Sequence, residues 1–379
     1  MSRKARLVVV ILIVLVAVLV GVVWWNFRAN RVTDLPSASP TSEVPSGEQP
    51  SSEMPLAVFL VQGLEIPWAL DFLPDGSMVL TERPGRIRLI DSQEGLLAEP
   101  LLTIAEVIHR GEGGLLGIAV HPDFASNHFI YVYYTYQERD GLANRVVRFR
   151  KEGKTLLDKK IIIDSIPGAA IHNGGRIRFG TDGLLYIATG DSSVADLAQD
   201  RDSLAGKILR LKDDGTIPPD NPFSGSPVYS LGHRNPQGLA WDVQGRFWAV
   251  EHGSNATDEL NLIKAGSNYG WPVIRGDEKK AGLESPLLHS GQETWAPSGL
   301  AFFNDSLFFA GLRGQSLYQV VIADGEVKLQ RHLERKFGRL RDVVVGPDNM
   351  LYLLTSNRDG RGVPTAADDQ LIRINPGKL

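Results

Sequence analysis

The sequence contains no cysteine, so no disulfide contributes to its fold. It also lacks a strong charge of either sign, because 40 lysine and arginine residues stand against 44 aspartate and glutamate residues. These charges are mixed along the chain, which argues against a nucleic-acid-binding surface. No amphipathic helix of useful length is evident, which argues against an α/β fold. Stability must therefore come from the core, with a bound metal as a further candidate.

One long apolar run stands near the start of the chain, from Leu7 to Trp25. A helix of this length, at about 1.5 Å per residue, approaches the ~30 Å hydrocarbon core of a bilayer. Arg3, Lys4 and Arg6 precede the run and predict an internal N-terminus and an exported remainder, periplasmic or extracellular. No small-residue cleavage site follows, so we expect residues 1–27 to be an uncleaved membrane anchor. A cleaved signal, with secretion, is the alternative.

Residues 28–56 are rich in serine, proline, glutamate and threonine, as in LPSASPTSEVPSGEQPSSEMP. Such a composition buries too little apolar surface to offset its ordering entropy, so we expect a disordered linker. Residues 57–379 are long enough for one large β domain.

This domain repeats one pattern, as in IRFGTDGLLYIATGD and VVVGPDNMLYLLTSN. Alternating strands joined by Asp-Gly-type turns are typical of β-hairpins. Six such units begin near Leu70, Ile118, Ile177, Leu239, Leu300 and Val343. Repeats of this size stack radially as four-stranded blades, so the sequence predicts an all-β, six-bladed β-propeller. We expect the first strand, LAVFLVQ, to pair with the last unit and close the ring.

Five loops are rich in glycine or asparagine, and arginine or histidine stands within or directly beside each of them. They are GEGGLLG (111–117), IHNGGRI (171–177), LGHRNPQGL (231–239), EHGSNATDELNLIKAGSNYGWP (251–272) and GRLRDV (338–343). Glycine and asparagine permit left-handed turns and close backbone approach to a ligand. Loops at one end of a propeller converge around its axis, so these five segments predict a functional site there.

Four longer strings carry a family resemblance: IHNGGRIRFGTDGLLYIATGD, LGHRNPQGLAWD, DELNLI with GSNYGWP, and LRDVVVGPDNMLYLLT. Over about residues 60 to 375, the chain resembles the soluble aldose sugar dehydrogenases that use pyrroloquinoline quinone, a family that includes the soluble quinoprotein glucose dehydrogenases. The resemblance implies oxidation of the C1 hydroxyl of an aldose to a lactone, with the quinone as hydride acceptor. An electron acceptor must then reoxidise the quinone, and no motif of the chain identifies it.

The resemblance also implies roles for individual residues. His172 matches the base that takes the hydroxyl proton, and a histidine bonded within a turn is the alternative. Arg234 and Asn235 match the pair that contacts the quinone oxygens. Arg313, Arg339 and Arg341 match positions that meet the cofactor carboxylates, whereas solvated strand charges are the alternative.

Calcium is the implied metal. Glu259, through its carboxylate, and Tyr269, through its carbonyl, match one calcium site of the family. Gly253 and Ser254 match two carbonyl ligands of a second calcium that polarises the quinone as a Lewis acid. Without the resemblance, Glu259 reads as an ordinary acid at the start of a strand.

Two positions depart from the family pattern. Glu112 stands where glutamine is common; its carboxylate could repel the acidic cofactor, become protonated through burial, or bond to the sugar. Ser254 replaces a proline, which keeps the carbonyl but loosens the turn. Two other functions fit a six-bladed propeller: a calcium-dependent lactonase or esterase, and a non-catalytic binding module on a membrane stalk.

Overall fold

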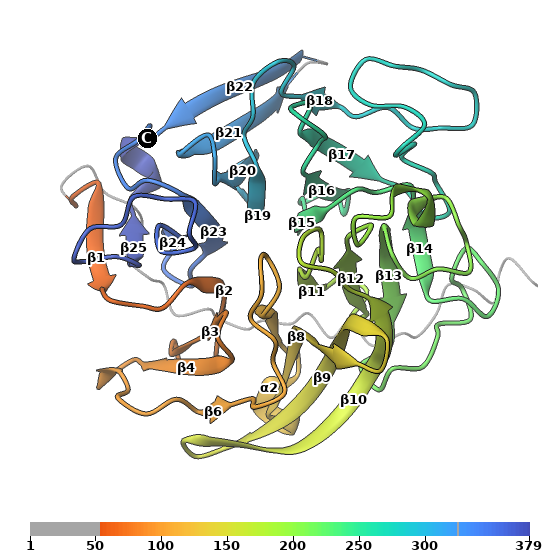
Figure 1. The fold of residues 1–379 in the computed structure, drawn as a ribbon. Coiled ribbons are helices and arrows are strands. Elements are labelled where there is room, and N and C mark those ends of the chain that lie inside the picture. Colours follow the sequence, from red (N-terminus) through yellow and green to blue (C-terminus); the bar gives the residue numbers. More distant parts are fainter. Residues whose placement is uncertain (1–53, 324–325) are drawn as a thin grey trace, which may run out of the picture. The chain divides into compact units, whose positions relative to one another are not determined.

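Six antiparallel sheets surround a common axis in residues 54–323 and 326–379, the part that this computed structural model describes (Figure 1). Five of the sheets have four strands, and the remaining sheet has a short fifth. Each of the six predicted unit starts falls within the innermost strand of one sheet. The predicted six-bladed β-propeller is therefore confirmed.

The strands of the six blades are β2 Pro67–Phe72, β3 Met78–Glu82, β4 Arg86–Asp91, β5 Gly95–Leu96 and β6 Leu102–Thr103 in blade 1; β7 Leu115–Val120, β8 Phe129–Glu138, β9 Gly141–Glu152 and β10 Thr155–Pro167 in blade 2; β11 Ile177–Phe179, β12 Leu185–Thr189, β13 Lys207–Leu211 and β14 Val228–Leu231 in blade 3; β15 Pro236–Trp241, β16 Phe247–Glu251, β17 Glu259–Ile263 and β18 Leu288–His289 in blade 4; β19 Pro297–Phe303, β20 Ser306–Gly311, β21 Ser316–Ala323 and β22 Glu326–His332 in blade 5; and β23 Leu340–Val345, β24 Leu351–Thr355, β25 Leu371–Ile374 and β1 Ala57–Val61 in blade 6.

The first strand closes the ring, as predicted. β1 pairs antiparallel with β25, with Ala57 opposite Ile374 and Phe59 opposite Ile372. Just before β1, the carbonyl of Leu56 accepts a hydrogen bond of 2.9 Å from the backbone N–H of Asn375. The edge of the last blade is thus covered by the beginning of the domain.

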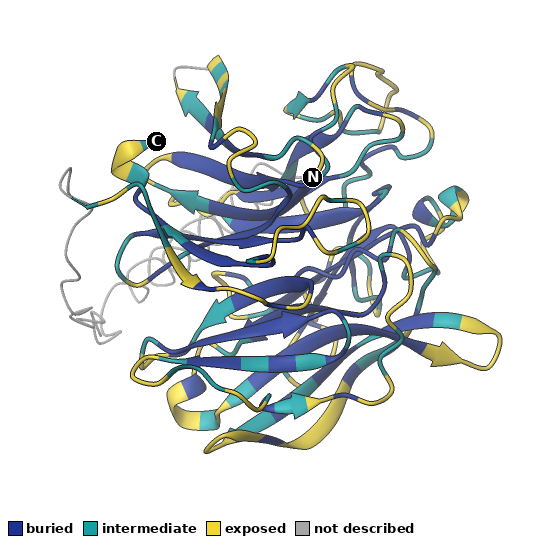
Figure 2. Ribbon diagram, turned by 60° about the vertical axis from the view of Figure 1, so that its left-hand side comes forward, coloured by how far each residue is buried: buried dark blue, intermediate teal, exposed yellow. Residues whose placement is uncertain are grey.

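The inner and middle strands of the blades are the most buried, and the outer strands are the least buried (Figure 2). Every residue of the middle strands β3, β12, β16 and β24 is buried, and apolar side chains of neighbouring blades pack together. The outer strands β10 and β22 are mostly exposed. The turns follow the expected chemistry: Gly76 has a φ of 82°, and the N–H of Ser77 donates to Asp75 Oδ1 at 2.9 Å.

Helical structure is confined to short segments in the described part of the chain. These are α2 Phe124–Asn127 and the 3₁₀ turns Ala195–Ala198 and Pro376–Lys378. Within residues 54–323 and 326–379, no helix is long and apolar enough to cross a membrane. The predicted anchor (1–27) and the predicted linker as far as residue 53 lie outside the described residues.

The order of the strands gathers the five predicted loops at one face. Each blade starts with its innermost strand, so the segments preceding these strands all lie at the same end of the axis. The segments that follow the second strands return to this end, among them the loop after β16 and the loop after β24. We call this end the loop face.

Candidate active site

His172 and Asp191 form a hydrogen-bonded pair at the loop face. The Nδ1 atom of His172 lies 2.8 Å from Oδ1 of Asp191. The other carboxylate oxygen of Asp191 accepts a hydrogen bond of 2.8 Å from Nε1 of Trp271. The side chains of His172 and Asp191 are only 13% and 2% exposed. Because a carboxylate only accepts hydrogen bonds, it selects the imidazole tautomer with hydrogen on Nδ1, and the Nε2 lone pair remains to accept a proton.

Asp191 is a site residue that our sequence reasoning did not single out. It ends the string IATGD, directly after the buried strand β12. Pairing of β11 with β12 brings this position beside the corner that holds His172. Asp191 follows the second strand of the hairpin that His172 precedes, and an acid in this position relative to a candidate base could have identified it from the sequence.

Two glycines are required by the tight corner around His172. His172 itself has a φ of 61°. A Cβ on Gly190 would lie 1.9 Å from the carbonyl oxygen of His172, and a Cβ on Gly174 would lie 2.6 Å from that of Ala188. Any side chain at either position would therefore push His172 out of place.

Asn235 and Arg234, which precede β15, each have a buried nitrogen without a partner. The Asn235 side chain is buried, and its Oδ1 accepts the N–H of Gly174 at 2.9 Å. Among the described residues, nothing accepts a hydrogen bond from Asn235 Nδ2 or Arg234 Nε. Burial lowers the pKa of Arg234, although Asp191 and nearby glutamates oppose this shift. Buried donors are usually paired, so both atoms are available to a ligand at this face.

Arg341, on β23, also combines a bonded side chain with a buried nitrogen that has no partner in the part of the chain that the structure describes. Its Nη1 donates to Gln237 Oε1 at 2.8 Å, whereas its buried Nε has no partner within the described chain. The ring of Trp68 lies 5.6 Å from Cζ of Arg341 and 4.4 Å from Cζ of Arg176. Burial lowers the pKa of Arg341 to about 9, so an anionic ligand would stabilise its charged form.

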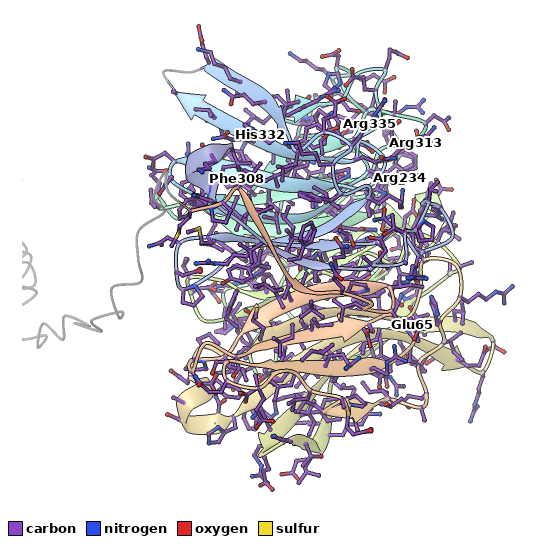
Figure 3. The ribbon with its side chains drawn as sticks, turned by 90° about the vertical axis from the view of Figure 1, so that its left-hand side faces the viewer. Glu65, Arg234, Phe308, Arg313, His332 and Arg335 are labelled. Carbon is purple, nitrogen blue, oxygen red and sulfur yellow. The ribbon has the colours of Figure 1, made fainter. Side chains whose placement is uncertain are left out.

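Arg339 and Arg313 differ from Arg341. Arg339 already has a carboxylate partner, because its Nη2 lies 2.8 Å from Asp359 Oδ2. Its Nη1 donates to the carbonyl of Leu312 at 3.3 Å. Arg313 is exposed, although it lies toward the same face as Arg234, away from Phe308 and His332 (Figure 3).

Glu112 is an ionised carboxylate rather than a protonated one. Burial raises its pKa, but His252, the backbone N–H of His172 and Arg361 outweigh that effect and bring the pKa to about 2. One carboxylate oxygen accepts the N–H of His172 at 3.0 Å, and the other lies 2.7 Å from Nη1 of Arg361.

Two neighbouring cavities at the loop face bring most of the predicted residues together. The first, which we call the inner cavity, is lined by Trp68, Glu112, Asn173, Gly174, Gln237, His252, Leu312, Arg341 and Arg361. The second, the outer cavity, is lined by Gly232, Arg234, Glu251, His252, Gly253, Ser254, Glu259, Tyr269, Trp271, Ile274 and Arg275. His172 adjoins the inner cavity through Glu112, which accepts its N–H, and the outer cavity through Asp191, which bonds to Trp271. Asn235, Arg339 and Arg313 are not among the lining residues of either cavity.

A larger cavity opens at the opposite end of the axis. Most of its lining residues are apolar, among them Phe72, Trp241 and Phe302, and its charged groups are Asp71 and Arg178. Apart from Leu239, the last residue of the segment 231–239, no residue of the five loops lines it. Convergent polar groups of the kind a redox site needs are therefore gathered at the loop face.

Glu259 has the character of a cation ligand. Burial and the neighbouring Glu251 raise its pKa to about 8. Glu251 has its own partners, since His233 Nδ1 lies 2.8 Å away and the N–H of Arg234 donates at 2.7 Å. A metal ion at Glu259 would remove the cost of its buried charge. The described residues contain no group of three or more His, Cys, Asp or Glu side chains suited to a metal, so carbonyl oxygens would have to complete the site.

Gly253 and Ser254 begin a strained loop. Asn255 and Thr257 have φ values of 61° and 56°, and the N–H of Gly253 donates to Asp258 Oδ1 at 2.9 Å. The hydroxyl of Ser254 lies 2.9 Å from Nη1 of Arg275, so a cationic side chain already lies beside the loop predicted to bind calcium. The Glu259 and Tyr269 site therefore fits calcium better than the Gly253 and Ser254 site.

Comparisons with known proteins agree with this architecture. The family model described as Glucose / Sorbosone dehydrogenase matches residues 64–372. The solved structure of the PQQ-bound form of an aldose sugar dehydrogenase from Streptomyces coelicolor is 42% identical in sequence. It has a TM-score of 0.79 and covers 83% of this chain and 96% of its own.

Two curated relatives are also named as sugar dehydrogenases. An aldose sugar dehydrogenase of Escherichia coli is 35% identical over 347 residues, which are 83% of this chain and 91% of the relative. Quinoprotein glucose dehydrogenase B of Acinetobacter calcoaceticus is 34% identical over 256 residues, 59% of this chain and 53% of the relative.

Proposed function

The chain belongs to the glucose/sorbosone dehydrogenase family, and on that basis we propose that it oxidises the C1 hydroxyl of aldose sugars to lactones, with pyrroloquinoline quinone as hydride acceptor and calcium as Lewis acid. The observation that carries the proposal is the set of unpaired buried donors beside the His172–Asp191 pair: Nε of Arg234, Nδ2 of Asn235 and Nε of Arg341. These groups fit a ligand rich in carbonyl and carboxylate oxygens.

His172 is the proposed base. Its Nδ1–H donates to Asp191, so the Nε2 lone pair would take the proton of the C1 hydroxyl while hydride leaves C1. The imidazolium that forms is stabilised by the Asp191 carboxylate, which Trp271 holds in place. The quinone, when bound, supplies the two-electron acceptor.

The arginines have separate proposed roles. Arg234 would stabilise negative charge that develops on the cofactor oxygens during hydride transfer, and Asn235 would fix a neighbouring oxygen. Arg341 would bind a carboxylate through its unpaired Nε. Arg339, paired with Asp359, would contribute through its remaining N–H groups.

Calcium has two candidate positions. Glu259 and the carbonyl of Tyr269 would hold one ion, and the carbonyls of Gly253 and Ser254 would hold another against the quinone. The raised pKa of Glu259 supports the first position, because a bound cation favours its ionised form.

The same proposal includes export. Residues 1–27 would anchor the domain on the outer side of the membrane, and a cleaved segment would release it. Fractionation of cells that make the full chain tests the anchor. Recovery of the protein with the membranes supports the anchor, and recovery in the soluble fraction contradicts the anchor.

Reconstitution tests the proposed function. Metal-free protein is titrated with pyrroloquinoline quinone and calcium, and then given an aldose and a dye acceptor. Dye reduction that requires quinone, sugar and protein together supports the proposal. Lactone hydrolysis that requires calcium but no quinone would support the lactonase instead. If the protein has neither activity, a non-catalytic binding module is the remaining function.

A further inference from the structure

Arg361 completes the wall of the inner cavity, and neither the sequence motifs nor the family comparisons assign it a role. It lies in the loop between β24 and β25, and its Nη1 atom is 2.7 Å from Oε1 of Glu112, which precedes β7. The pair thus joins blade 6 to blade 2 across blade 1. The Arg361 side chain is 52% exposed, whereas that of Glu112 is 19% exposed.

The backbone around Arg361 is held in place by the residues of the site. The N–H of Arg361 donates to Asp359 Oδ1 at 2.9 Å, and Asp359 Oδ2 binds Arg339. A Cβ on Gly362 would lie 2.9 Å from Cδ of Arg339 and 2.5 Å from the carbonyl of Asn357. The loop therefore packs tightly on Arg339, and this packing directs Arg361 to the cavity.

The charges on the wall of the inner cavity depend on Arg361. Apart from His252, the ionisable side chains that line it are Arg341, Arg361 and Glu112. Two guanidiniums thus face one carboxylate, and the wall carries a net positive charge. Without Arg361, the remaining charged side chains of the wall would be Arg341 and Glu112, and their charges would cancel. A cofactor with three carboxylates binds better in a positive pocket, so this loss would weaken its binding.

We propose that Arg361 determines the affinity for the carboxylate-bearing cofactor, because its guanidinium offsets the charge of Glu112 at the cavity wall. This inference rests on the proposed function, which supplies the identity of the cofactor. It also explains how this chain carries a carboxylate where its family commonly has glutamine.

A purely mechanical role for the pair makes a different prediction. If the Arg361–Glu112 contact only fastened the loop, then loss of either partner would weaken binding in the same direction. If Arg361 acts through charge, then loss of Arg361 weakens binding, whereas Glu112→Gln strengthens it. The glutamine oxygen can still accept the N–H of His172, so this substitution changes charge with little change of shape.

The experiment is an equilibrium titration of the calcium-supplemented protein with pyrroloquinoline quinone, without sugar, followed by quenching of tryptophan fluorescence. Trp68 and Trp271 line the two cavities and serve as reporters. The variants are Arg361→Gln, Arg361→Lys, Glu112→Gln and the double Arg361→Gln/Glu112→Gln. The control is Arg150→Gln, which breaks the Arg150–Asp158 pair of 2.7 Å on the outer part of blade 2.

We expect Arg361→Gln to bind the quinone about tenfold more weakly and Glu112→Gln about tenfold more tightly, at low salt. The double variant and Arg361→Lys should stay within about threefold of the unsubstituted chain, and Arg150→Gln should match it. In about 1 M salt the differences should shrink, because the Debye length falls to about 3 Å.

Weaker binding by Glu112→Gln, or unchanged binding by Arg361→Gln, would overturn this inference and leave the proposed function intact. Absence of quinone binding by every form, including the unsubstituted chain, would overturn both. Thermal melts of the quinone-free variants report whether each one folds. If Arg361→Gln fails to fold, the sign of the Glu112→Gln effect still decides between the two roles.

Discussion

The Nδ1 atom of His172 lies 2.8 Å from a carboxylate oxygen of Asp191, whose other oxygen accepts a hydrogen bond from Trp271 Nε1. This chain of three side chains joins blade 3 to the loop after β17 in blade 4. It fixes the orientation and the tautomer of the imidazole before any substrate is present. A base prepared in this way loses little free energy to reorientation during the reaction.

Replacement of His172 by alanine should reduce kcat at least a hundredfold, the usual effect of losing a general base. Quinone affinity should change less than about threefold, because the imidazole is not among the proposed carboxylate ligands. Steady-state dye reduction gives kcat, and fluorescence titration gives the affinity. Unchanged turnover would remove His172 from the mechanism.

Asp191→Asn should reduce kcat more than Asp191→Ala does. The amide oxygen of asparagine can still accept from Trp271, so its NH₂ group would face Nδ1 of His172. That donor selects the tautomer with hydrogen on Nε2, which cannot act as a base; we expect a loss on the order of a thousandfold. The ratio of kcat for the two variants is the measurement, and equal values would argue against tautomer selection.

Arg341→Gln should weaken quinone binding more than Arg339→Gln does. Arg341 has an unpaired buried Nε, whereas Arg339 is already bonded to Asp359. We expect a loss of about tenfold to a hundredfold for Arg341→Gln and a smaller loss for Arg339→Gln. Titration without sugar measures both, and the reverse order would show that Arg339 is the main carboxylate ligand.

Calcium should stabilise the protein more at pH 8 than at pH 6. Burial beside Glu251 raises the pKa of Glu259 to about 8, so the folded state retains a proton that the unfolded state releases above about 4.5. The contribution of Glu259 to stability therefore falls as pH rises between these values in the metal-free protein. Calcium binds the ionised form and competes with that proton.

Melting temperatures with calcium and with a chelator test this pH dependence. Glu259→Gln is the comparison, because it keeps the size of the side chain and removes the titration. We expect the calcium-induced increase in Tm to grow with pH in the unsubstituted chain. In Glu259→Gln it should be smaller and nearly independent of pH, because only the position at Gly253 and Ser254 remains. An equal increase in both proteins would place calcium elsewhere.

The blades could be predicted from the sequence because each depends on local patterns. Leu70 and Val343, which lie far apart in the chain, both start alternating segments with Asp-Gly or Asp-Asn turns. Such segments specify hairpins through short-range contacts, and closure by the strand Ala57–Val61 follows from the need to cover an edge. These features require no knowledge of distant partners.

The partners within the site could not be predicted in the same way. Asp191 bonds to Trp271 and Glu112 bonds to Arg361, and each pair joins different blades. Arg313 resembles a cofactor ligand by its position in the sequence; its side chain is exposed and lines neither cavity, and its role stays a prediction. The direction of a side chain at a loop depends on packing between blades, which one sequence does not specify.

The central claim is that Arg234, Asn235 and Arg341, beside His172, hold pyrroloquinoline quinone. A crystal structure of the chain with this quinone and calcium tests it most directly. We predict quinone oxygens within hydrogen-bonding distance of Arg234 Nε, Asn235 Nδ2 and Arg341 Nε, with Nε2 of His172 facing the ring. Quinone bound at another place, with these three nitrogens still unpaired, would contradict the claim.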